Sequence, residues 1–241
     1  MTKKLNQEQQ LNKHDVTGGV YKILNLYACL GGNRYKWDEV AKEKGIEIEV
    51  TAIEYDEELA KLYQERFPND KVIIEDAHQF LLDHYKEFDF IWSSPPCPSH
   101  SRARFARNET TKAIYPDFKL YEEVVFLDNY FNGKFVVENV IPFYEPLIQA
   151  KKRGRHLYWT NFNLPSDLRE RKSSIMEGSD EVNKWCKFHD YDFYKYKGTQ
   201  RRDKIARNLV DYEAGRTIFE TYLGIEKKSN VNQVSIFDAI G

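Results

Sequence analysis

The chain has 241 residues, of which 41% are hydrophobic and 31% charged, and its formal net charge is −2. This length suffices for one α/β domain with at most a small appendage, and a nearly neutral chain lacks a general basic field, so nucleic-acid binding would need local basic clusters. Three cysteines without paired spacing argue against a disulfide framework and favour a reducing compartment. Residues 1–19 contain no apolar stretch long enough for a signal sequence or a membrane span, so we expect a soluble cytoplasmic protein with no membrane partner.

The first structured unit predicted is a strand, a turn of small residues and a helix. Residues 1–19 are polar and are expected to form a flexible N-terminus. The apolar run of residues 21–26 predicts a strand, and a helical pattern covers residues 35–44. Between them lies the turn Tyr27-Ala28-Cys29-Leu30-Gly31-Gly32. This arrangement lets backbone approach a ligand at a helix N-terminus, although glycine pairs also occur in ordinary turns.

Acidic side chains follow the second and third predicted strands. The strand over residues 48–56 carries Glu54, about twenty residues beyond the glycine turn, where an acid can bind the two hydroxyls of a ribose. Asp56 and Glu57 suit the N-terminus of the next helix, because acids are favourable near the positive end of the helix dipole. The third strand ends in Asp76, which can cap the following helix or face the base of a ligand.

The fourth predicted strand, residues 88–92, is followed by the motif Pro95-Pro96-Cys97. Proline fixes φ and cannot continue a ladder, so Cys97 is expected on a stiff turn just beyond the carboxyl end of a strand. A basic loop follows, and nearby cations favour the reactive thiolate. Cys97 is therefore a candidate nucleophile, and the alternative is a small side chain that fills a loop.

The fifth predicted strand, residues 134–140, carries Glu138 at its carboxyl end. A buried parallel strand should be apolar throughout, so this acid either has a function or faces solvent at the strand end. Strands alternate with helices of 3.6-residue period, which predicts a mainly parallel, doubly wound α/β sheet. Such a sheet brings the glycine turn, Glu54, Asp76, Cys97 and Glu138 to one edge.

The chain contains no complete set of metal ligands. Cys186 and His189 are spaced as only half of a zinc site, which we reject. His78 and His84 fit the surface of a predicted helix better than a ligand set. We therefore expect no resident metal ion.

With the glycine turn, Pro95-Pro96-Cys97 and Glu138-Asn139-Val140 in this order, the sequence resembles the DNA cytosine-5 methyltransferases, particularly their small phage-type members. The resemblance continues in Arg153-Gly154-Arg155 and in Arg207-Asn208-Leu209-Val210, a C-terminal motif that packs back near the cofactor in this family. It covers nearly all of residues 22–224. It implies a Rossmann-like, S-adenosylmethionine-dependent methyltransferase fold.

The resemblance also implies a division of the chain. Residues 20–164 would form the cofactor-binding and catalytic domain, and residues 165–197 a short target-recognition region. Residues 198–224 would form helices that return to the catalytic domain, followed by a flexible tail, residues 225–241.

The family's mechanism gives roles to the motif residues. Cys97 would add to C6 of a cytosine that is flipped out of the duplex, because C5 alone is too weak a nucleophile to take a methyl group. Glu138 would bind the N3/N4 edge and favour protonation at N3. Arg155, with Arg153 in support, would hold O2 and stabilise developing negative charge.

The remaining implied sites are cofactor and nucleic-acid contacts. Residues expected around S-adenosylmethionine are Tyr27, Ala28, Cys29, Leu30, Gly31, Gly32, Glu54, Tyr55, Asp76, Pro95 and Asn208. Residues expected at DNA, on a closing loop, are Ser99, Ser101, Arg102, Arg104 and Arg107.

Three features depart from the family pattern. Cys29 stands where glycine is usual, and Pro98 stands where a glutamine commonly follows the catalytic cysteine. The recognition region is short for the family. It mixes cations with aromatic side chains, which suits DNA contact or, equally, a packed aromatic subdomain.

The tail contains Gln233-Val234-Ser235-Ile236-Phe237 after a polar linker. This peptide resembles the short motif with which bacterial replication proteins dock on the sliding clamp. Gln233 would donate or accept a directional hydrogen bond, and Ile236 and Phe237 would be the apolar anchors. The alternative is that these side chains cover an apolar patch of the enzyme itself.

Other functions remain open from sequence. Ser94-Pro95-Pro96 also fits an amino-methyltransferase acting on adenine N6 or cytosine N4, although those enzymes want an aromatic ring after the prolines. An RNA cytosine-5 methyltransferase would carry the same residues. A catalytically idle DNA- or clamp-binding protein on the same fold is a further alternative, which the intact Cys97, Glu138 and Arg155 disfavour. We expect a bacterial or phage-infected host cytosol, and a companion restriction enzyme is compatible with this reading.

Overall fold

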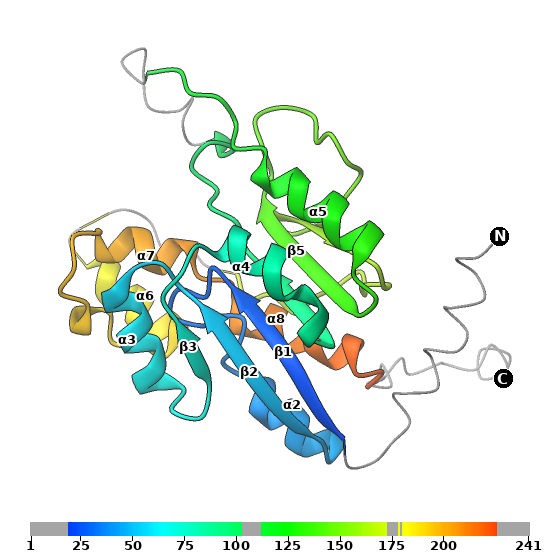
Figure 1. Ribbon diagram of the computed structural model, residues 1–241. Coiled ribbons are helices and arrows are strands. Elements are labelled where there is room, and N and C mark those ends of the chain that lie inside the picture. The colour runs from blue at the N-terminus through cyan, green and yellow to red at the C-terminus, as the bar shows by residue number, and fades with distance from the viewer. Residues whose placement is uncertain (1–18, 103–111, 173–177, 179, 226–241) are drawn as a thin grey trace, which may run out of the picture.

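The computed structural model describes residues 19–102, 112–172, 178 and 180–225, and every structural statement below concerns these residues. Their core is a seven-stranded sheet in the order β3-β2-β1-β4-β5-β7-β6 (Figure 1). The strands are β1 (Val20–Leu26), β2 (Glu47–Ile53), β3 (Lys71–Ile73), β4 (Phe90–Ser93), β5 (Lys134–Val140), β6 (Lys151–Arg153) and β7 (His156–Thr160).

The sheet is doubly wound, as the sequence predicts. From β1 the chain builds outward through β2 and β3, and it then returns to β4 on the other side of β1. The pairs from β3 to β5 are all parallel, whereas β7 is antiparallel to both β5 and β6. The order therefore reverses between β1 and β4, and in open α/β sheets the crevice beyond the carboxyl ends at that point binds ligands.

Helices connect the strands, and their ends follow local sequence signals. The helices are α2 (Trp37–Lys44), α3 (Glu57–Arg66), α4 (Ala77–His84), α5 (Lys119–Tyr130), α6 (Glu181–His189), α7 (Arg202–Asn208) and α8 (Tyr212–Tyr222), with 3₁₀ turns η1 (Tyr85–Glu87) and η3 (Phe193–Lys195). Asp56 caps α3, because its carboxylate accepts the Glu58 and Leu59 N–H groups at 3.0 and 3.1 Å. This confirms the capping role predicted for Asp56.

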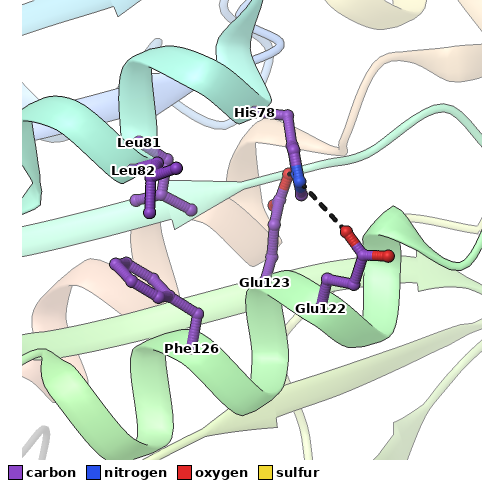
Figure 2. Close-up of a pocket in the computed structure, with 6 residues that line it drawn as sticks. All are labelled: His78, Leu81, Leu82, Glu122, Glu123 and Phe126. Carbon is purple, nitrogen blue, oxygen red and sulfur yellow. Dashed lines mark hydrogen bonds and ion pairs between the residues drawn. The ribbon is translucent and has the colours of Figure 1, made fainter.

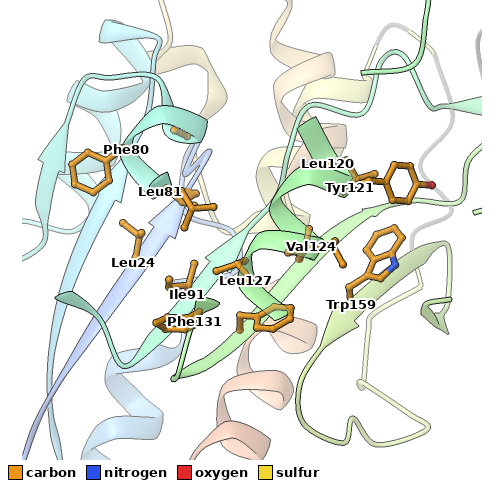
Figure 3. Packing of buried hydrophobic residues seen from close by; sticks show 14 of the residues in the cluster. Leu24, Phe80, Leu81, Ile91, Leu120, Tyr121, Val124, Leu127, Phe131 and Trp159 are labelled. Atoms are coloured by element: carbon orange, nitrogen blue, oxygen red, sulfur yellow. The ribbon is translucent and has the colours of Figure 1, made fainter. Parts of the chain in front are cut away.

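The helices cover both faces of the sheet (Figure 1). On the face of α4 and α5, Figure 3 shows Leu81 and Leu127 packed with Leu24 and Ile91 of the central strands. Each such fully buried side chain stabilises the fold by about 1.5–3 kcal/mol. On the other face, α2 and α8 pack around a second cluster that includes Trp37.

The region beyond β7 packs on α3 and on the glycine turn. Trp185 of α6 and Tyr196 are buried in a cluster with Leu30 and Leu59. These two aromatic side chains are therefore packed in a core, whereas Tyr194 of the same region is exposed. None of the helices in the described ranges is long and apolar enough to cross a membrane.

Candidate active site

A cavity of about 670 Å³ lies at the carboxyl ends of the parallel strands. Residues from the end of every predicted parallel strand line it, together with residues of α7 and of the turn between β6 and β7. The predicted site residues in its lining are Tyr27, Cys29, Glu54, Tyr55, Asp76, Pro95, Cys97, Ser101, Glu138, Arg155 and Asn208. The sheet therefore gathers most of the predicted constellation in one place.

The glycine turn forms one wall through an unusual backbone. Tyr27, Cys29 and Gly31 have φ values of 54°, 47° and 65°, in the left-handed region that favours glycine. Cys29 thus adopts a conformation suited to the glycine that the family usually has there. Ala28, Leu30, Gly31 and Gly32 are buried within the turn and do not line the cavity.

Gly32 is the point where the C-terminal motif meets the turn. A methyl group at Gly32 would collide with the carbonyl oxygen of Val210. A methyl group at Gly215 of α8 would likewise collide with the backbone of Asn33. Asn208 reaches the cavity from the same segment, so the structure brings the C-terminal motif beside the turn as expected.

Glu54 holds the turn while its carboxylate faces the cavity. Its Oε2 accepts the Cys29 N–H at 2.7 Å, and its Oε1 accepts the Asp56 N–H at 2.9 Å. Burial raises the pKa of Glu54, and the backbone N–H bonds only partly offset this effect. Asp76 also lines the cavity, and its Oδ1 caps α4 by accepting the Gln79 N–H at 2.9 Å.

Cys97 lies on a fixed turn after β4. The Cys97 carbonyl accepts the N–H groups of His100 and Ser101, both at 3.0 Å. On the other side, the Asn139 side chain donates a 2.9 Å hydrogen bond to the Pro95 carbonyl, which ties the end of β5 to the double-proline turn. Cys97 and Glu138 therefore stand on two strand ends that are hydrogen-bonded to each other.

The electrostatics of Cys97 correct one expectation. Burial and the charge of Glu138 raise the pKa of the Cys97 thiol, and Lys204 and Arg155 only partly oppose this rise. The following loop is expected to favour the thiolate, but its Arg102 is not among the main groups that act on this pKa. Its guanidinium instead donates to the Pro142 carbonyl at 2.9 Å. Arg155 and Lys204, which do act on Cys97, come from distant segments.

The two arginines of the Arg-x-Arg motif diverge. Arg155 lines the cavity and donates to the Arg207 carbonyl at 3.3 Å. Arg153 does not line it. Its guanidinium donates to the carbonyls of Pro165 at 2.5 Å and Leu164 at 3.1 Å and fixes the segment after β7.

The other predicted nucleic-acid and tail residues are placed as follows. Ser99 is buried, and its hydroxyl accepts the Asp117 N–H at 3.0 Å, whereas Ser101 reaches the cavity. Arg104, Arg107, Gln233, Ile236 and Phe237 lie outside the described residues.

Sequence reasoning missed several lining residues. His156, Gln200, Lys204 and Arg207 all line the cavity. Lys204, Arg207 and Asn208 follow the i, i+3, i+4 spacing of one helix face. Because Asn208 was a predicted site residue, this spacing could have indicated Lys204 and Arg207 as well. His156 directly follows Arg155, and only the pairing of β7 with β5 shows what it approaches.

A second, smaller cavity of about 250 Å³ lies between α4 and α5 (Figure 2). Its wall includes Glu123, which is buried and accepts hydrogen bonds from Tyr27 Oη at 2.6 Å and Ser93 Oγ at 2.5 Å. His78 Nδ1 lies 3.0 Å from Glu123, and its Nε2 lies 3.2 Å from Glu122. The hydrogen bond to Glu123 raises the pKa of His78.

Comparisons with known proteins identify the family. A model of the C-5 cytosine-specific DNA methylases matches residues 21–155, more than half of the chain. The structure of EhMeth, a methyltransferase of Entamoeba histolytica, is similar with a TM-score of 0.51 and 10% identity, over 87% of this chain and 100% of that one.

Two further solved structures match smaller parts. A variant of Spodoptera frugiperda DNMT2 has a TM-score of 0.35 and 23% identity over 50% of this chain, and the match spans 35% of its own length. TrmN of Thermus thermophilus has a TM-score of 0.38 and 16% identity, over 64% of this chain and 47% of that one. No curated protein sequence matches.

The family match covers the glycine turn, the Pro-Pro-Cys turn, the Glu-Asn-Val strand end and the Arg-x-Arg motif that surround the cavity. This chain therefore belongs to the C-5 cytosine-specific DNA methylases, cytosine-5 methyltransferases whose methyl donor is S-adenosylmethionine.

Proposed function

We propose that this chain methylates C5 of a flipped-out cytosine in DNA through a covalent adduct with Cys97. The observation that carries the proposal is the meeting of Cys97, Glu138 and Arg155 in one cavity beside the glycine turn. A nucleophile, an acid–base group and a cation are the three components that addition to the pyrimidine ring requires.

The cavity suits S-adenosylmethionine on the side of the glycine turn. Tyr27 and Cys29 would lie along the cofactor, with Glu54 at the ribose. Each oxygen of Glu54 accepts one backbone N–H and retains a second lone pair, so the carboxylate can accept the two ribose hydroxyls while it holds the turn. When bound, S-adenosylmethionine supplies an electrophilic methyl group.

The raised pKa of Cys97 defines the first chemical step. At neutral pH the thiol keeps its proton, so attack requires a base close by. Glu138 is the neighbouring carboxylate. It takes the thiol proton as the sulfur approaches C6, and it gives that proton to N3 as the S–C6 bond forms and the C5–C6 π bond opens. One proton thus moves from sulfur to N3 through Glu138, and no net charge is created.

Arg155 stabilises the ring during this addition. Its guanidinium lines the cavity next to the Arg207 carbonyl and would donate to the O2 atom of the pyrimidine. Donors aimed at developing charge in a water-poor site are commonly worth about 10²–10³ in rate. After methylation the C5 proton is lost to solvent and the S–C6 bond breaks. Glu138 then takes the proton from N3 and returns it to the departing thiolate, which restores the thiol and the carboxylate.

The substrate is proposed to be DNA. The matched family is one of DNA methylases, and a base inside a duplex can be reached only after it is flipped out. RNA is the competing substrate, because the reacting ring is the same and the difference lies in contacts to the sugar.

Trapping tests the proposal directly. Genomic fragments copied with 5-fluorocytosine, as DNA and as RNA, are incubated with the protein and S-adenosylmethionine. Fluorine cannot leave C5 as a proton does, so a complex that survives denaturant should form with DNA. Cys97→Ala should abolish it, whereas Cys186→Ala on α6 should not. Trapping by Cys97→Ala would exclude the covalent role, and trapping of RNA alone would assign the protein to RNA.

A further inference from the structure

We propose that His156 is a positioning residue that supports the proton chemistry of Glu138, and that Glu170 holds it in this role. The inference rests on the proposed function. His156 begins β7 and is 6% exposed. The β5–β7 ladder pairs Glu138 with Tyr158 and Val140 with His156. Glu138 and His156 are therefore diagonal neighbours on the same face of the sheet.

The two ring nitrogens of His156 lie between two carboxylates. Nε2 is 3.6 Å from Glu138 Oε1, and Nδ1 is 3.5 Å from Glu170 Oε1. These are ion-pair distances, too long for direct hydrogen bonds with good geometry. A proton on either nitrogen therefore interacts electrostatically with a carboxylate, and the ring links Glu138 of the cavity to a second acid behind it.

Glu170 is built into this arrangement. Gly154, between the two motif arginines, has a φ of 52°, and a methyl group there would collide with the Glu170 carboxylate. Burial acts to raise the pKa of Glu170, but the nearby His156 ring, together with the charge of Arg155, outweighs burial and lowers it. Glu170 is thus an ionised partner on the far side of the ring.

The other charged and titratable groups that face this cluster are few among the described residues. Burial first, and then the charges of Glu138 and Glu170, raise the pKa of Tyr158 well above its usual value, while Arg155 opposes them. Cys97 and Lys204 lie in the same cavity. His156 is the group that lies within ion-pair distance of both carboxylates.

The function follows from the proton path. When Glu138 gives its proton to N3, a carboxylate remains beside the newly formed adduct. The His156 ring beside that carboxylate sets its orientation toward N3, and Glu170 orients the ring in turn. A carboxylate behind a metal-ligating histidine plays a comparable orienting part in metalloenzymes, where its loss costs about 10–100-fold in metal affinity or activity.

The experiment measures addition separately from methyl transfer. DNA carrying tritium at cytosine C5 releases it to water on reversible addition of Cys97, without a methyl donor. His156→Gln keeps a polar side chain but cannot carry the proton. We expect exchange and single-turnover methylation to fall about 10–100-fold, with unchanged affinity for DNA and for S-adenosylhomocysteine.

Two further variants sharpen the test. Glu170→Gln should slow exchange less than His156→Gln, and the double variant should be no slower than His156→Gln alone, because both act through one ring. His84→Gln changes a half-buried histidine of α4, remote from the cavity, that lies 2.7 Å from Glu87; it is the matched control and should be unaffected.

The outcomes separate cleanly. The inference is overturned if His156→Gln exchanges tritium within twofold of the unaltered protein. It is also overturned if the loss of exchange is accompanied by weaker ligand binding and a lower melting temperature, because the substitution then damages the fold as a whole. If His156→Gln does not fold, Glu170→Gln decides: slowed exchange with intact affinity supports the inference, and unchanged exchange overturns it. If the unaltered protein exchanges tritium from neither DNA nor RNA, the proposed function fails and the inference falls with it.

Discussion

The hydroxyl of Tyr27, in the wall of the candidate active-site cavity, donates a 2.6 Å hydrogen bond to Glu123, a buried residue of α5. The same carboxylate accepts from Ser93 and lies beside His78 in the smaller cavity of Figure 2. The Tyr27 side chain is therefore anchored to α5, and this hydrogen bond fixes the position of its ring in the cavity wall.

Tyr27→Phe removes one donor from a buried carboxylate, and hydrogen bonds to charged groups are worth about 1.5–3 kcal/mol. We expect the free energy of unfolding to fall by about that amount in urea titrations and S-adenosylhomocysteine binding to weaken less than tenfold. Tyr130→Phe on the exposed side of α5 is the control. Unchanged stability of Tyr27→Phe would show that Glu123 finds another donor.

The thiol of Cys97 should react slowly near neutral pH. Its pKa is raised, so the thiolate fraction, and with it the rate of alkylation by iodoacetamide, should keep rising with pH beyond the range of an ordinary thiol. Glu138→Gln removes a charge that raises this pKa and should speed alkylation at pH about 8. Arg155→Ala should slow it. Peptide mass spectrometry reads the rate at Cys97 alone, and an unchanged rate in both variants would contradict the electrostatic account.

Glu138→Gln should damage chemistry more than cofactor binding. An amide keeps the shape of the side chain but cannot pass the proton to N3, and loss of a positioned acid typically costs about 10²–10⁴-fold in rate. Single-turnover methylation measures the loss, and calorimetry with S-adenosylhomocysteine provides the control. Methylation within a factor of two of the unaltered protein would make Glu138 merely structural.

Gly32→Ala should destabilise the protein by about 1–3 kcal/mol, because the added methyl group meets the Val210 carbonyl and forces the C-terminal segment away. Cofactor affinity should fall at the same time, since Asn208 moves with that segment. Gly178→Ala, where an added methyl group meets open space, is the matched control. Equal melting temperatures for the two variants would argue against tight contact at Gly32.

The tail prediction remains to be tested on the full chain. If residues 233–237 dock on a sliding clamp, truncation after Lys228 should abolish recovery of purified host clamp and leave the melting temperature and methylation of short oligonucleotides unchanged. If truncation lowers the melting temperature and the intact protein does not bind clamp, the peptide covers the enzyme's own surface.

The sequence predicted the sheet and the strand-end residues well, because hydrophobic periodicity and strand ends are local signals. β5 has the predicted bounds, and Cys97 and Glu138 meet as expected. The rise in the pKa of Cys97 could not be predicted, because it depends on burial and on charges brought from far along the chain. The direction of Arg153 and the neighbours of His156 likewise depend on how the β6–β7 hairpin pairs with β5.

The contacts of Gly32 with Val210 and of Asn33 with Gly215 join the start of the domain to its last helix. During synthesis on a ribosome, the first strand and its turn emerge long before their partner at Gly215. The wall that the glycine turn gives to the cavity therefore stays incomplete until α8 has left the exit tunnel. A nascent chain halted before Leu209 should not bind S-adenosylmethionine. A newly released chain should begin to bind it only when α8 docks.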